Sequence, residues 1–329
     1  MNTLNYHKLS FLDRFRLNEG IDKLKSHYHY LVKFNTNKAA NLINDKKLHF
    51  CTLFVLQPVI KGTNYSEYLN SQNESALEFI TDMLEKDVSN KKNSENIHKQ
   101  PNYSVLKWIL ETGWLDDGLN NKYDEILDKS AILLTKKYND ISIINIIVEI
   151  IFSRHRKGLY IHDMVWALFE SRSIQSLIIT AQRLHSKQWR DVKLACKLLG
   201  FIPGIDIEFN KNRVKPYLVF LNWIEENSSF LNYTGEGFQQ TPTPEPYAVS
   251  LEAKYLCKIS AMDNPKPLRL LNEESKRLEI FKILDKNTRI LLSRFSFYLF
   301  RQNYHEWIRW INYPVEKQIR IAKTMGGEL

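Results

Sequence analysis

Glycine and proline are scarce in this chain, with 11 Gly and 10 Pro among 329 residues. Sandwiches and barrels need many tight turns, so this scarcity argues against an all-β architecture and favours long helices. Hydrophobic residues make up 43% of the chain and aromatic residues 12%, which is enough to build a sizeable core. The sequence therefore predicts an all-α fold, either an irregular multi-helix array or a loosely α-solenoid-like bundle.

Cysteines and long apolar runs are also scarce. Cys51, Cys196 and Cys257 are odd in number, far apart and without metal-ligand spacing, which argues against a disulfide framework and indicates a reducing compartment. The first residues show no apolar signal region, and the longest apolar run, 141–152, is too short to span a bilayer. We expect a cytoplasmic protein with no membrane span, no metal and no cofactor.

The excess of basic residues is modest for the length. A net charge of +9 and a pI near 9.2 permit an acidic partner but do not require one, because dedicated nucleic-acid binders usually cluster their charge. Richness in Lys, Asn and Ile is also typical of a genome-level compositional bias. Composition alone leaves both explanations of the basic charge open.

One polar segment interrupts the helical pattern. Residues 89–102 contain almost no apolar side chain, which predicts a linker or an exposed loop. We expect an N-terminal helical region over 1–88 and a main helical domain over 103–329. Within the main domain, alternating prolines predict an extended, stiff loop over 232–248, followed by a C-terminal helical segment.

Several element boundaries follow from local patterns. Residues 8–34 predict one helix, and Gly113 is expected to cap the end of another. The apolar run 48–57 has no periodicity that separates a buried helix from a minor buried strand, so both remain open. Pro58 and Gly62 are expected to close that run.

His162 and Asp163 form the one pair that suggests catalysis. Adjacent His and Asp on a helix, with His155 before them, resemble the HD phosphohydrolases, whose metal site activates water. That site needs a further His and Asp from other helices, and the large residues around the pair, such as Trp166, differ from the family's pattern. A structural role at a helix start is the favoured interpretation.

The C-terminal helical segment carries the candidate binding residues. At 100° per residue on one helix over 289–311, the basic and polar members fall within about one-quarter of the circumference. Arginine suits phosphates or a partner's carboxylates, although most charged stripes are solvated. The residues assigned to binding are Arg294, Tyr298, Arg301, His305 and Arg309.

An aromatic stripe lies beside them, formed by Phe297, Phe300, Tyr304, Trp307 and Ile311. We expect this stripe to be mostly buried against the rest of the protein. The sequence favours a non-enzymatic macromolecular binding or scaffold protein, acting through helical surfaces and this Arg/aromatic helix, with a protein as partner. Two alternatives remain: a nucleic-acid-binding protein that uses the basic C-terminal face, and an enzyme whose site is assembled from distant residues. The oligomeric state stays open.

Overall fold

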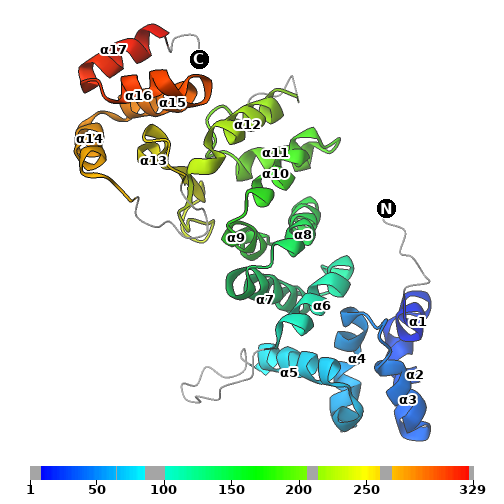
Figure 1. The fold of residues 1–329 in the computed structure, drawn as a ribbon. Coiled ribbons are helices and arrows are strands. Elements are labelled where there is room, and N and C mark those ends of the chain that lie inside the picture. Colours follow the sequence, from blue (N-terminus) through cyan, green and yellow to red (C-terminus); the bar gives the residue numbers. More distant parts are fainter. Residues whose placement is uncertain (1–8, 64, 86–100, 206–213, 260–268, 326–329) are drawn as a thin grey trace. The chain divides into compact units, whose positions relative to one another are not determined.

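The computed structural model describes residues 9–63, 65–85, 101–205, 214–259 and 269–325 (Figure 1). Helices account for 75% of these residues, and the strands form one two-stranded sheet. The all-α, multi-helix prediction is confirmed. The chain divides into two compact units, residues 1–171 (unit 1) and 172–329 (unit 2). Within the described ranges, every helix falls short of the length and apolar character needed to cross a membrane.

Unit 1 is a succession of helices in which near neighbours along the chain pack on one another. Helix α4 packs on α2, α5 and α6, and α7 packs on α6 and α9. The helices are α1 (Phe11–Glu19), α2 (Ile21–Phe34), α3 (Thr36–Ile43), α4 (Phe50–Gly62), α5 (Ser71–Glu85), α6 (Tyr103–Gly113), α7 (Asn121–Tyr138), α8 (Ile144–Lys157) and α9 (His162–Glu170). Three short 3-10 turns connect them: η2 (Tyr65–Tyr68), η3 (Trp114–Asp116) and η4 (Ile141–Ile143).

The single helix expected over 8–34 is two helices. Gly20 has a φ of 88°, in the region that favours glycine, and it separates α1 from α2. Helix α1 begins at a capping box in which the Ser10 hydroxyl accepts from the Asp13 N–H and the Asp13 carboxylate accepts from the Ser10 N–H. A capping box at Ser10 and a positive φ at Gly20 therefore delimit two helices, which apolar periodicity alone predicts as one.

Most of the ambiguous run 48–57 belongs to a helix, since α4 begins at Phe50 and Leu48 and His49 precede it. Most of α4 is buried, because it is apolar on nearly every side and has packing partners on several. Pro58 lies inside this helix with its ring exposed, so the expectation that it closes the run is wrong. The strands lie elsewhere, in unit 2.

The division between the units falls after Ser171, and not at the polar segment 89–102. Residues 86–100 lie outside the described residues. Helices α5 and α6, which precede and follow that segment, pack on each other, as do α4 and α6. Both sides of the polar segment therefore lie in one compact unit, which composition along the chain does not reveal.

Unit 2 combines helices with a small antiparallel sheet at the ends of the Pro-rich loop. Strand β1 (Leu231–Tyr233) pairs with β2 (Tyr247–Val249) in the register that places Asn232 opposite Ala248. The helices are α10 (Ile174–Gln182), α11 (Trp189–Leu198), α12 (Val214–Asn227), α13 (Leu251–Tyr255), α14 (Asn272–Ile283), α15 (Lys286–Gln302), α16 (Tyr304–Ile311) and α17 (Val315–Met325), with 3-10 turns η5 (Arg183–His185) and η6 (Ser228–Phe230).

Helices α13 to α17, yellow to red in Figure 1, share a hydrophobic core, and we call them the C-terminal bundle. Tyr255 of α13 is its central residue. Its ring stacks on Phe281 of α14 at 4.4 Å and meets Trp310 of α16 at 6.2 Å. Its hydroxyl donates to Gln318 of α17 at 2.8 Å, and its carbonyl accepts from Ser296 of α15 at 2.6 Å. One buried residue therefore contacts all four other helices of the bundle, three through its side chain and α15 through its carbonyl.

Gly113 generates a stability prediction. It ends α6 with a φ of −91°, so it is not the left-handed cap expected from the sequence. A Cβ there would lie 2.8 Å from the Tyr123 hydroxyl and 2.9 Å from Leu127. We expect Gly113→Ala to lower the free energy of unfolding by ~1–3 kcal/mol in urea titrations, the usual cost of overpacking. Gly62→Ala, whose Cβ would meet nothing within 4 Å, is the matched control and should have little effect.

Candidate binding surface

The five candidate binding residues lie on two helices. Arg294, Tyr298 and Arg301 belong to α15, whereas His305 and Arg309 belong to α16. Asn303 separates the helices with a φ of −152° and a ψ of 92°, and its side chain caps α16 by accepting from the Glu306 N–H. The prediction of one continuous helix over 289–311 is therefore wrong, and the five residues do not form one stripe.

Each arginine of the set meets a carboxylate. Arg294 lies 3.5 Å from Glu226 and Arg301 lies 3.0 Å from Glu225, and both carboxylates come from α12.

The third arginine, Arg309, lies 2.9 Å from Glu306 of the same helix, α16. These pairs are half-exposed, so each contributes little to stability. The carboxylates of these pairs do compensate the positive charge that would attract phosphates. This supports the interpretation that the three arginines form a surface rim and not a phosphate site.

The expected burial of the aromatic stripe is wrong for Phe300 and Tyr304, which are 36% and 52% exposed. Their rings and that of the half-buried Trp307 contact one another, with centroids 5.2 to 5.6 Å apart. We call Phe300, Tyr304 and Trp307 the aromatic cluster. The buried aromatic residues of this segment are instead Phe295 and Trp310, which pack at 5.3 Å.

Hydrogen bonds to the bundle core fix one ring of the aromatic cluster. The Trp307 indole N–H donates to the Ser296 hydroxyl at 2.8 Å, and that hydroxyl donates to the Tyr255 carbonyl in the bundle core. A ring whose orientation is set before binding loses little conformational entropy when a partner covers it. Trp307 therefore has the chemistry and the fixed orientation of an interface anchor.

Lys254 is a charged residue that sequence analysis missed. It is only 2% exposed, and its ammonium donates to Asn227 at 2.8 Å and lies 3.7 Å from Glu226. The ring of Phe297 lies 5.6 Å from the same nitrogen. Burial lowers the pKa of Lys254 to about 8, against the opposing effect of Glu226. Glu226 thus links Lys254 to Arg294, which gives that arginine a structural role.

A second buried charged group lies in unit 1. Arg154 is 2% exposed and donates to Asp117 from Nε at 2.8 Å and from Nη2 at 2.7 Å, while Nη1 donates to Asp128 at 3.0 Å. Two carboxylates on one guanidinium leave an excess negative charge away from water. Burial raises the pKa of Asp128 to about 7, and Arg154 opposes this only in part.

The His162–Asp163 pair borders this group. Helix α9 begins at His162 and carries Asp163 in its first turn, and the His162 ring lies 4.6 Å from that of Tyr160. The charge of Asp163 contributes to the raised pKa of Asp128. Across the described residues, no three side chains of His, Cys, Asp and Glu are grouped so that they could hold a metal ion.

Asp128→Asn should change how stability depends on pH. The folded protein binds the Asp128 proton more tightly than the unfolded chain, whose Asp pKa is about 3.9, so this residue makes the wild type less stable as pH rises from ~4 to ~7. Asparagine imitates the protonated acid and removes that loss. Urea unfolding from pH 4 to pH 8 should show the variant gaining ~2–4 kcal/mol relative to the wild type. Parallel curves would contradict a raised pKa.

The two classes of aromatic residue should differ in stability. Trp310→Ala removes a buried core ring and should lower the free energy of unfolding by ~3–5 kcal/mol. Phe300→Ala removes a ring that is partly in water and should cost only ~1–2 kcal/mol. Urea titrations of both variants followed by circular dichroism test this. Equal losses would place Phe300 in the core.

Comparisons with known proteins assign no relative: no family model, no curated protein and no solved structure matches the chain. The aromatic cluster of α15 and α16 combines exposed rings with a fixed indole, as interface anchors do.

Proposed function

We propose that this protein is a non-enzymatic macromolecular binding or scaffold protein, and that a partner protein docks on the aromatic cluster. The observation that carries the proposal is the exposure of Phe300 and Tyr304 in a cluster whose third ring, Trp307, is fixed by a hydrogen bond. Tyr and Trp are enriched where protein interfaces bind most tightly. Tyr298 and Ile308, both partly exposed, extend the apolar area of the same two helices.

The paired arginines favour a protein over a nucleic acid at this surface. The carboxylates of Glu225 and Glu306 accompany Arg301 and Arg309, so a phosphate backbone would meet negative as well as positive charge. A protein interface tolerates such a mixed polar rim around an aromatic centre. His305, which is exposed on α16, belongs to this rim.

Affinity capture with matched variants tests the proposal. We expect Phe300→Ser/Tyr304→Ser to lose a protein partner that the wild-type chain retains from lysate of the source cells, because the variant removes the anchor rings. The control is Tyr30→Ser/Phe34→Ser in unit 1, which changes another contacting pair of exposed rings, 58% and 72% exposed, in the same way. Melting temperatures should show that both variants are folded.

Nuclease treatment separates the two classes of partner in the same experiment. The captured protein should remain after nuclease digestion, and a photo-crosslinker in place of Ile308 should form a covalent adduct with it. Loss of the partner after digestion, or an equal loss in the Tyr30/Phe34 control, would contradict docking on the aromatic cluster.

A further inference from the structure

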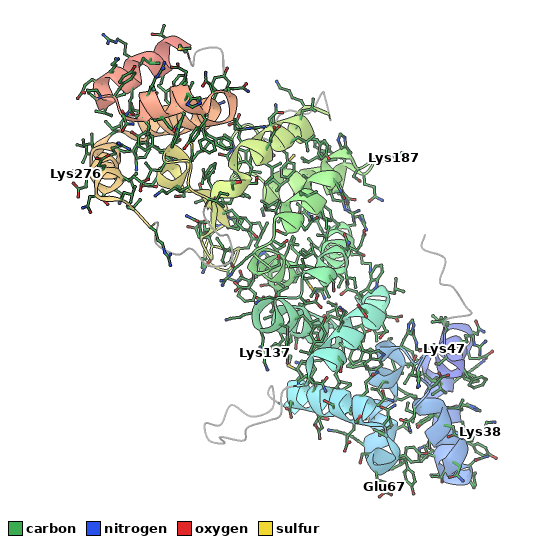
Figure 2. All side chains as sticks on the ribbon, in the orientation of Figure 1. Lys38, Lys47, Glu67, Lys137, Lys187 and Lys276 are labelled. Carbon is green, nitrogen blue, oxygen red and sulfur yellow. The ribbon has the colours of Figure 1, made fainter. Side chains whose placement is uncertain are left out.

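Positive charge is concentrated in the C-terminal part of the chain. Residues 269–325 contain 12 Lys and Arg but only 6 Asp and Glu, and so supply most of the net charge of +9. Lys276 of α14, labelled in Figure 2, is one of the exposed cations of this region. Pairing with carboxylates decides which of these cations remain available to an anionic partner.

The cations of α17 are not paired. Arg320 and Lys323 are exposed and Lys317 is half-buried, and none of the three forms an ion pair within the described residues. The ammonium of Lys317 lies over the ring of Tyr313, 3.4 Å from its centroid. Residues three positions apart lie on one side of a helix, so the three cations form a row, which we call the basic ridge. The ridge spans ~9 Å at 1.5 Å per residue.

The opposite side of α17 fixes the ridge in orientation. Ala322 and Gln318 are buried, and the Gln318 amide donates to the carbonyls of Ile311 and Tyr313 while its oxygen accepts from Tyr255. The apolar side of the helix is thus used in the bundle core. The basic side faces away from the core because Gln318 and Ala322 fix the opposite side, and the three cations take no part in those contacts.

We propose that the basic ridge of α17 binds the phosphate backbone of a nucleic acid. Uncompensated Lys and Arg release condensed counterions when they neutralise phosphates, and this release drives such binding. A membrane surface fits less well, because an interfacial helix inserts a free apolar side and that of α17 is buried. A protein partner fits less well because Lys is depleted at protein interfaces. Contacts to the backbone alone imply little sequence preference.

Fluorescence anisotropy with a labelled 20-nucleotide single strand and the matching 20-base-pair duplex tests the ridge. Lys317→Gln/Arg320→Gln/Lys323→Gln should weaken binding at least tenfold at low salt, and the slope of log affinity against log salt should flatten by about 2–3. The control Lys33→Gln/Lys38→Gln/Lys46→Gln removes three exposed charges from unit 1 and should weaken binding less than threefold. Arg320→Gln/Lys323→Gln serves if the triple variant is unstable.

Three outcomes would overturn the assignment. The first is that the wild type binds neither oligonucleotide. The second is that the unit 1 control loses as much affinity as the ridge variant, which would show that only the total charge of the protein matters. The third is tighter binding of phosphatidylserine vesicles or polyglutamate than of the oligonucleotides. The assay contains no partner protein, so its result is independent of docking on the aromatic cluster.

Discussion

The buried contacts of Tyr255 are the constraint on which the C-terminal bundle depends. Its ring contacts Phe281 and Trp310, its hydroxyl holds Gln318, and its carbonyl holds Ser296. The two surfaces proposed to bind partners are each linked to this residue by one hydrogen-bonded side chain. Ser296 orients the indole of the aromatic cluster, and Gln318 fixes the helix that presents the basic ridge. A small helix of five residues, α13, thereby determines the geometry of both.

Charge pairing gives residues of one type different roles within this bundle. Arg294 and Arg301 are compensated by α12, and Glu226 also serves the buried Lys254, so these charges link helices. Lys317 and Arg320 have no such carboxylate in the described structure and remain available. The attraction of a surface for an anion therefore follows its uncompensated charge, and not its number of arginines.

The sequence predicts the parts of the fold that depend on local pattern. The helical class follows from sparse Gly and Pro, and the Pro-rich loop expected over 232–248 begins and ends at the paired strands β1 and β2. Helix α4 was ambiguous because a helix buried on all sides has no periodicity to detect. The packing of α5 on α6 across a polar segment lies beyond local pattern, because no local window contains that contact.

The prediction of the candidate site is wrong at specific positions for the same reason, which is that local patterns do not reveal the contacts that form there. A single asparagine, Asn303, turns the chain between α15 and α16, although the apolar spacing of three and four continues through it. The carboxylates that compensate Arg294 and Arg301 come from residues about 70 positions earlier, at Glu226 and Glu225. Burial of Lys254 likewise depends on Asn227, so no pattern around the lysine reveals it.

The break at Asn303 has a consequence for function that a continuous helix would not provide. Because α16 begins a new helix, the Trp307 indole can donate a hydrogen bond to Ser296 of α15. The Tyr304 ring can in turn stack on the Trp307 ring. The rings that a straight helix would have distributed along one side are gathered into one cluster, in which Phe300 and Tyr304 are exposed and Trp307 is fixed by a hydrogen bond. The fully buried aromatic positions of this segment are instead Phe295 and Trp310, and Trp307 packs against that core from its edge. Separation of the residues that stabilise from those that are exposed allows a binding surface to change without loss of the fold.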